Sequence, residues 1–199
     1  MEFDFTKEYQ LEDDITLLKP LQDYHIPELL DIANEPNIWD YSFIKGNGLH
    51  NLTNYVHATI NARKNKREYP FIVIDKRKNA VAGCTRFCEI NPFLKNTRLG
   101  YTWYSQEFQG TGLNKHCKYL LFDFAFTIMN MQRIGLGAYI ENKRSIAAMK
   151  SVGCIEEGKY RKALPHPNGE GRSDAILFSI LKEEWTTSKK EILKQKLIR

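Results

Sequence analysis

Cysteine is scarce in this chain, and its spacing does not suit a metal site. The 199 residues include four cysteines, and no two of them form a Cys-x-x-Cys pair. Cys84 and Cys88 share one strand-like run, whereas Cys117 and Cys154 are isolated. Structural zinc sites usually draw on closely spaced cysteines and histidines. We therefore expect four reduced, mostly buried thiols and no bound metal.

Long apolar runs are also absent. No stretch approaches the roughly 20 apolar residues that a membrane-spanning helix needs. Residues 1–5 are mixed and acidic, which is not the pattern of a secretory signal. We therefore expect a cytoplasmic protein with no membrane partner.

The chain has only a modest excess of charge, +5 at neutral pH. Much of it falls at residues 63–67 and in the tail at 189–199. A protein that reads nucleic acid usually concentrates basic charge on one face with a docking element, and neither segment has such an element. We expect no nucleic-acid partner, although mild positive charge would attract an anionic small molecule.

Length and composition indicate a single globular domain. Hydrophobic residues make up 42% and charged residues 27% of the chain, which is ordinary for a packed domain. We predict one domain over residues 1–199, with a core at about 15–185 and a basic C-terminal helix or tail at 186–199.

Hydrophobic periodicity predicts a mixed α/β fold with one central sheet. Asp23 is expected to cap the first helix, and the buried side of the helix at 113–129 is expected to include Leu120, Leu121, Phe124, Ala125 and Ile128. Strands are predicted at 15–18, 71–75, 80–90, 97–104, 133–140 and 175–181, and helices at 23–33, 51–63, 113–129 and 145–151.

A glycine turn follows the predicted strand at 97–104 and opens the helix at 113–129. Gly110 and Gly112 would leave backbone N–H groups exposed at a helix N-terminus, where a phosphate group is stabilised. The P-loop pattern fails, because no Gly-Lys-Ser/Thr follows, and the dinucleotide fingerprint fails, because Lys115 stands where its third glycine belongs. A coenzyme A site and a plain structural turn both remain open.

The setting of this turn resembles the GNAT (GCN5-related N-acetyltransferase) superfamily, in its RimJ/RimL-type branch. Residues 100–104 and 109–115 resemble its fourth strand, turn and third helix, and residues 141–145, 152–154 and 157–158 resemble its Asn-x-x-Ser block. Segments at 18–21, 82–87 and 172–181 resemble its first, third and closing strands. The likeness covers about residues 15–185.

The resemblance implies a mostly antiparallel sheet that splays between its fourth and fifth strands, with acetyl-CoA held in the splay. The strand at 101–104 would pair with the pantetheine arm, the turn would bind the pyrophosphate, and Asn142 would bond to the arm. The cofactor-binding residues expected on this basis are Tyr101, Thr102, Trp103, Tyr104, Gln109, Gly110, Thr111, Gly112, Leu113, Asn114, Lys115 and Asn142.

The resemblance also implies direct attack of a neutral primary amine on the acetyl thioester. A protein N-terminus, with a pKa of about 8, is partly neutral at pH 7, whereas a lysine needs more help. Backbone N–H groups on the fourth strand would stabilise the oxyanion. Ser145 is the candidate proton donor to the leaving thiolate.

Several positions depart from the family pattern. Glu107 stands where Arg or Gln is frequent, and we expect its side chain to point away from the pyrophosphate. Met149 replaces a frequent tyrosine acid, and Arg98 replaces a frequent glutamate base. Glu89 on the preceding strand is a candidate substitute for that base.

Trp39, Tyr41 and Arg86 are the candidate substrate-binding residues. Trp39 and Tyr41 lie in the loop between the first two helices, which lines the acceptor pocket in this family, and pocket and core roles both stay open. The acceptor would be a protein N-terminus or a small amine such as a polyamine, an amino acid or an antibiotic. The alternative hypothesis is a non-catalytic acyl-CoA-binding sensor or scaffold domain. A homodimer is compatible with either hypothesis.

Overall fold

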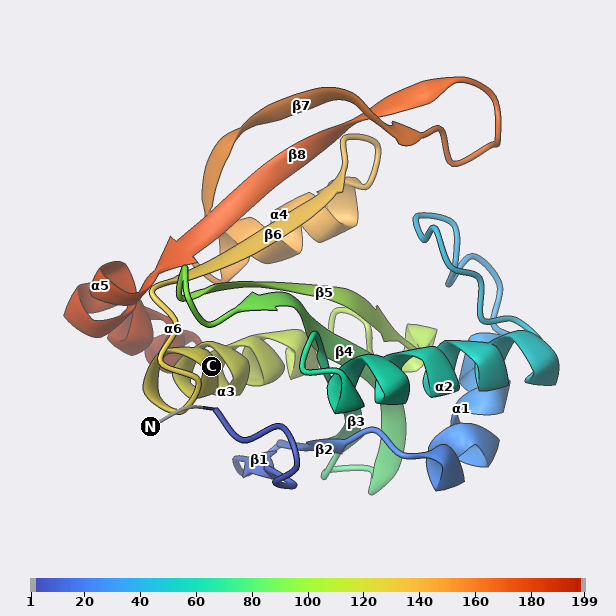
Figure 1. Cartoon of the computed structure of the whole chain (residues 1–199), viewed down its shortest axis with the longest axis horizontal. Coiled ribbons are helices and arrows are strands. Elements are labelled where there is room, and N and C mark those ends of the chain that lie inside the picture. The colour runs from blue at the N-terminus through green and yellow to red at the C-terminus, as the bar shows by residue number, and fades with distance from the viewer. Residues whose placement is uncertain (1–2, 198–199) are drawn as a thin grey trace.

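One eight-stranded sheet runs through the protein (Figure 1). The computed structural model describes residues 3–197. The strands follow the order β1-β2-β3-β4-β5-β6-β8-β7, and all neighbours are antiparallel except β5 and β6. The strands are β1 (Leu11–Glu12), β2 (Thr16–Pro20), β3 (Tyr69–Asp75), β4 (Ala80–Asn91), β5 (Asn96–Tyr104), β6 (Arg133–Tyr139), β7 (Ile155–Pro165) and β8 (Arg172–Leu181).

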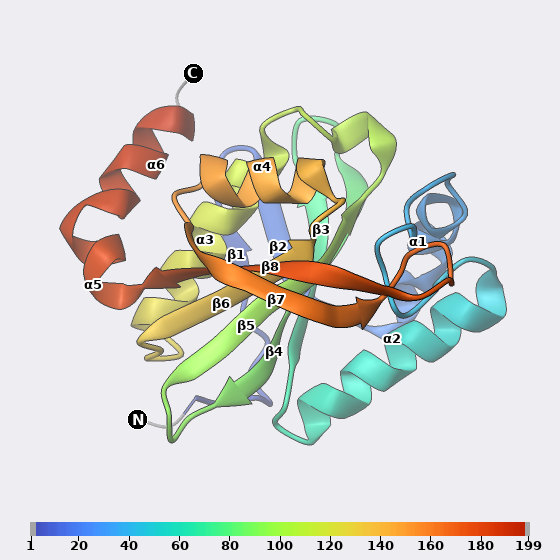
Figure 2. The ribbon, with the colours of Figure 1, turned by 90° about the horizontal axis from the view of Figure 1, so that it is seen from above.

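Helices cover both faces of the sheet, as Figure 2 shows from above. α1 and α2 lie together on one side, and α3 and α4 lie on the other. A short 3-10 turn at Asp23–His25 precedes α1, and another at Gln106–Phe108 precedes the glycine turn before α3. A π-helical turn at Trp185–Lys189 joins α5 to α6. The helices are α1 (Ile26–Ala33), α2 (Leu49–Lys64), α3 (Leu113–Thr127), α4 (Lys143–Ser151), α5 (Lys182–Glu184) and α6 (Lys190–Leu197).

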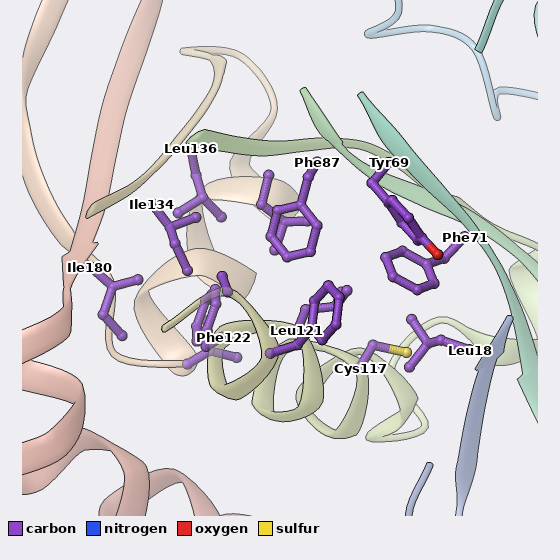
Figure 3. Close-up of a cluster of buried hydrophobic side chains, with 14 of the residues drawn as sticks. Leu18, Tyr69, Phe71, Phe87, Cys117, Leu121, Phe122, Ile134, Leu136 and Ile180 are labelled. Carbon is purple, nitrogen blue, oxygen red and sulfur yellow. The ribbon is translucent and has the colours of Figure 1, made fainter. Parts of the chain in front are cut away.

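The larger core lies between α3 and the sheet (Figure 3). α3 presents Cys117, Leu121 and Phe122, all fully buried, toward Phe87 of β4 and Ile134 of β6. The apolar residues of α3 recur at the three- and four-residue steps that place them on one helix face. Burying each large side chain stabilises the fold by about 1.5–3 kcal/mol. This core fixes α3, and hence its N-terminus, against β4 and β5.

A smaller core lies between α1, α2 and the opposite face of the sheet. Trp39 packs on Trp103 of β5 with ring centroids 5.0 Å apart, and Tyr55 of α2 lies edge-on to both rings. The Trp39 indole donates a hydrogen bond to the Ala33 carbonyl at 2.8 Å. The segment after α1 is thereby anchored on β5.

β5 and β6 run parallel for only a short distance. Their paired residues are Asn96 with Arg133, Thr97 with Ile134, and Arg98 with Gly135. Beyond Arg98 the two strands no longer pair, although β5 continues to Tyr104. The sheet therefore opens between β5 and β6, as the family resemblance implies for the fourth and fifth predicted strands.

The predicted helices and strands are present, with small shifts at their ends, but two strands were missed. β7 has mostly exposed residues and lies at the edge of the sheet, where it pairs only with β8. Its run of charged residues therefore shows no apolar alternation. β1 is too short to produce any periodic signal.

Two local predictions were wrong. Asp23 does not cap the first helix, because Gln22 is the N-cap of the 3-10 turn and α1 begins only at Ile26. The Asp23 carboxylate instead lies 3.3 Å from His57 of α2. Ile128 is 50% exposed, because α3 ends at Thr127 and the helical period no longer applies.

The C-terminal segment from Lys182 to Leu197 is helical and packs on the domain. Trp185 is buried against Phe122 of α3, and Leu193 of α6 is also buried. Among residues 3–197, no helix is long and apolar enough to cross a membrane. All four cysteines are free and buried, which confirms the prediction of reduced, buried thiols.

Candidate functional site

A bulge interrupts β5 beside the opening in the sheet. Cys84 of β4 pairs with Trp103 and Arg86 pairs with Gly100, so two residues of β5, Tyr101 and Thr102, face one residue of β4. Tyr101 has a φ of 49°, a left-handed conformation that is uncommon for a residue other than glycine. Such strain is typical of functional sites, where the surrounding structure holds it in place.

The glycine turn at Gly110 to Gly112 follows β5 after the short 3-10 turn at Gln106–Phe108. Both glycines have positive φ, 77° and 89°, and a Cβ built on either would meet no atom within 4 Å. Open space therefore lies directly over the turn. Within residues 3–197, the N–H groups of Gly110, Thr111 and Gly112 form no hydrogen bond. The first N–H groups of α3 also lack intrahelical acceptors, so the turn is a cluster of free donors at a helix N-terminus.

Side chains from the turn itself hold its shape. Gln109 Nε2 donates to the Tyr104 carbonyl at 2.9 Å, and Thr111 Oγ1 donates to the Phe108 carbonyl at 2.8 Å. The Tyr104 hydroxyl lies 3.4 Å from Asn114 Oδ1. These bonds tie the turn to the end of β5, so a ligand would find the free donors already arranged.

Cationic side chains reach the turn from two directions that the sequence did not reveal. Arg77, from the β3–β4 turn, donates to the Thr111 carbonyl at 3.3 Å and holds the pKa of the buried Asp75 below its usual range. Arg144 of α4 hydrogen-bonds Gln109 Oε1 across the opening. Lys78 lies 2.6 Å from the Glu107 carboxylate, and this ion pair offsets the acidic charge at Glu107.

Asn142 and Ser145 lie on the β6 side of the opening. Asn142 is the N-cap of α4, and its Oδ1 accepts the Ser145 N–H at 3.0 Å. Capping uses only the amide oxygen, so the Asn142 NH2 group stays available to a ligand. Ser145 is part-buried, and no hydrogen bond of its hydroxyl is found within residues 3–197.

A cavity of about 300 Å³ lies beside Tyr101 on the α2 side of the sheet. Its walls come from the loop before α2, from α2, from Glu68 just before β3, and from the middle of β4 and of β5. The lining residues are Ile44, Lys45, Asn51, Asn54, Tyr55, Ala58, Thr59, Glu68, Arg86 and Tyr101.

Arg86 and Glu68 form an ion pair in this cavity. Arg86 Nε lies 2.9 Å from Glu68 Oε2, but the two atoms are not aligned for a hydrogen bond, so the attraction is ionic. Arg86 is buried, its guanidinium stacks on the Tyr101 ring at 3.6 Å, and its Nη1 has no hydrogen-bond partner within residues 3–197. Burial raises the pKa of Glu68 despite the neighbouring Arg86. Glu68 was not singled out in the sequence, because nothing in its local pattern marks it.

The remaining predicted site residues, Trp39, Tyr41 and Glu89, do not lie together. Trp39 lies in the smaller core and does not line the cavity. Tyr41 is 39% exposed, and its ring lies 5.8 Å from that of Tyr139 at the end of β6, so it stands across the opening. Glu89 also has a positive φ, and its carboxylate, 67% exposed, lies 3.5 Å from Arg98 near the closed end of the opening.

The geometry suits a long ligand with an anionic end. An extended chain fits along the unpaired edge of β5, and a phosphate group fits over the glycine turn. The strained bulge and the cavity with Arg86 and Glu68 lie at the far end of that path.

Comparisons with known proteins agree with this geometry. Residues 16–155 match the family described as "Acetyltransferase (GNAT) domain". The putative ribosomal N-acetyltransferase YdaF of Bacillus subtilis is 33% identical over 95 residues, which cover 48% of this chain and 50% of YdaF. The chain thus matches about half the length of this curated relative.

Solved structures share the whole fold. A putative acetyltransferase from T. thermophilus is 25% identical, with a TM-score of 0.82 over 94% of this chain and 96% of that one. Mycobacterium smegmatis RimJ, solved in complex with CoA-disulfide, is 18% identical, with a TM-score of 0.81 over 98% and 97% of the two chains. At 18% identity, the likeness to RimJ concerns the fold alone.

Proposed function

Because the chain belongs to the GNAT acetyltransferase family, we propose that it transfers an acetyl group from acetyl-CoA to a primary amine by direct attack. The observation that supports this most strongly is the free glycine turn at the end of the unpaired edge of β5. The unpaired edge of β5 thus offers hydrogen-bonding groups to an extended chain, and the turn offers N–H donors to a diphosphate.

The residues of this path fit acetyl-CoA. The N–H groups of the turn and of the first turn of α3 would hold the pyrophosphate, with Arg77, Lys115 and Arg144 supplying positive charge. The backbone of β5 and the NH2 group of Asn142 would hold the pantetheine arm. When bound, acetyl-CoA supplies an activated acyl group.

The cavity beside Tyr101 is the proposed acceptor site. A buried carboxylate with a raised pKa accepts a proton more readily than an exposed one, and Glu68 lies in the cavity wall. Glu68 therefore joins Glu89 as a candidate to remove the proton of the incoming ammonium. The backbone N–H groups at the bulge are the proposed donors to the thioester oxygen, where negative charge develops during attack.

Ser145 remains the proposed hydroxyl partner of the leaving sulfur. It lies in the first turn of α4, three residues after Asn142, on the side of the opening that faces β5. Its hydroxyl donates no hydrogen bond within residues 3–197, so it is available to a ligand.

A protein N-terminus is the proposed acceptor. The name of YdaF, a putative ribosomal N-acetyltransferase, supports this choice. An α-amino group has a pKa of about 8, so it needs less help from a base than a lysine does.

The test is thiol release from acetyl-CoA in the presence of a panel of amines: peptides with different N-termini, polyamines, amino acids and aminoglycosides. We expect release with at least one class, and mass spectrometry of that acceptor should show one added acetyl group. Tight acetyl-CoA binding without release for any acceptor would favour the alternative, a non-catalytic acyl-CoA-binding domain.

A further inference from the structure

A lysine is buried beneath the opening in the sheet. Lys118, in the second turn of α3, is only 5% exposed although its residue type is rarely buried without a partner. Within residues 3–197 no carboxylate pairs with it, and the titratable groups near it are the Cys117 and Cys154 thiols, which are neutral because burial raises the pKa of both.

The amine of Lys118 reaches the wall of the opening. Its Nζ donates to Thr102 Oγ1 at 3.1 Å, and Thr102 Oγ1 in turn lies 2.7 Å from Thr85 Oγ1 of β4. Thr102 belongs to the bulged part of β5, beyond the last residue paired with β6. On the other side, Cys154 follows α4, whose N-terminal turn carries Ser145. The amine is thus placed between β5 and α4.

A buried ammonium with one neutral hydrogen-bond acceptor is costly. It has three N–H donors, and Thr102 accepts only one of them. Burial lowers the pKa of Lys118 to about 8, since the charged form loses its hydration. An anionic or polarisable group that enters beside the amine would lower the cost of burying its charge.

We propose that Lys118, rather than Ser145, is the catalytic residue that gives a proton to the sulfur leaving from acetyl-CoA and stabilises its charge, with the Ser145 hydroxyl as a hydrogen-bond partner of that sulfur. This inference rests on the proposed function. As the amine nitrogen forms its bond to the acetyl carbon, the carbon–sulfur bond breaks and the electron pair stays on sulfur. The Nζ proton moves to that sulfur, the new amide loses its extra proton to water or to a base, and solvent water reprotonates Lys118.

The test measures the pKa of the thiol in the bound product, coenzyme A, and therefore needs no known acceptor. A neighbouring ammonium favours a thiolate, so the bound thiol should ionise at least about one pH unit lower in the wild type than in Lys118→Met. The readout is the ultraviolet absorbance of the thiolate, corrected with the complex of desulfo-coenzyme A. The protein's own thiols stay protonated, because burial raises the pKa of Cys117 to about 11 and of Cys88 and Cys154 to about 12, and that of Cys84 further.

Two further variants separate charge from structure. Lys189 is the other lysine that acts on Cys154, and its amine pairs with Glu184 at 3.1 Å. Lys189→Met should therefore leave the pKa of the bound thiol unchanged. Lys118→Arg keeps the positive charge but has no proton to give at neutral pH. We expect it to retain a lowered thiol pKa yet, like Lys118→Met, to lose about 100-fold in kcat with little change in KM for acetyl-CoA.

The outcomes are distinguishable. Equal thiol pKa values in the wild type and Lys118→Met, or an equal shift caused by Lys189→Met, would overturn the role of Lys118 and leave the proposed function intact. Failure of the wild type to bind coenzyme A at all would overturn both.

Discussion

Buried and partly buried charged side chains mark the proposed chemistry at the scale of single residues. Arg86, Glu68 and Lys118 all lie close to the bulged segment of β5, and Arg86 and Lys118 are almost fully inaccessible to solvent. Removing such groups from water costs free energy that folding alone does not recover. Their concentration at one point of the sheet is what an active site requires and a purely structural sheet does not.

Glu68→Gln should change the pH profile of transfer. A base must be deprotonated to act, so kcat/KM should fall as pH drops through the pKa of Glu68, which burial raises above its usual range. Removing the carboxylate should abolish this acid limb and lower kcat/KM at pH 7 by about 100-fold. The measurement is the initial rate across pH with the best amine found.

Glu89→Gln is the matched comparison that separates the two candidate bases. Its carboxylate is exposed and paired with Arg98, so we expect less than about a threefold loss in rate. If Glu89→Gln removed the acid limb and Glu68→Gln did not, Glu89 would be the base, as the sequence first suggested.

Single-residue roles were the least predictable part. Trp39 and Tyr41 lie two positions apart in one loop, yet Trp39 turns into the core and Tyr41 stands at the opening. No local signal separates them, because long-range packing on Trp103 decides the direction. Lys118 did leave a signal, a lysine within the apolar pattern of α3, but a pattern search for apolar residues passes over it.

At the scale of elements, the ends of helices form the proposed binding site. The N-terminus of α3 offers free N–H groups at the glycine turn, and the N-terminus of α4 places Asn142 and Ser145 across from it. Arg144 joins the two by its bond to Gln109. Each element is held by its own core contacts, so the opening between them is preformed.

Asn142→Asp should separate two functions of the N-cap of α4. Aspartate keeps the capping oxygen that accepts the Ser145 N–H but lacks the NH2 donor. We expect near wild-type thermal stability and acetyl-CoA affinity reduced by about five- to tenfold in calorimetry. Asn142→Ala should lose the same affinity and, in addition, about 1 kcal/mol of stability. Full affinity in Asn142→Asp would show that the amide does not contact the cofactor.

Elements with strong periodicity were predicted well, and β7 shows why others were not. α2, α3 and the β3–β4 hairpin have apolar faces that are legible in the sequence. β7 is an exposed edge strand whose place is set by pairing with β8 further along the chain. That information is not local.

At the scale of the whole molecule, one parallel pair in an otherwise antiparallel sheet creates the site. β5 and β6 are joined through α3, so they lie parallel, and their pairing stops after Arg98. The Arg98 guanidinium lies over Gly137, and a Cβ added to Gly137 would lie 3.2 Å from it. The opening, the glycine turn and the α4 cap then meet at one edge. Composition and periodicity predicted an α/β sheet, but only the family resemblance implied where it would open, because strand order depends on distant pairings.

The most direct test of the account is the affinity of acetyl-CoA for Gly112→Val, measured by calorimetry. A Cβ at this position would enter the open space over the turn, where the pyrophosphate is proposed to lie. Gly169→Val in the β7–β8 loop is the matched control, because Gly169 has a similar φ of 87° and equally free surroundings. We predict affinity at least about tenfold weaker for Gly112→Val and unchanged for Gly169→Val. Equal affinities in the wild type and both variants would contradict the assignment of the turn to acetyl-CoA.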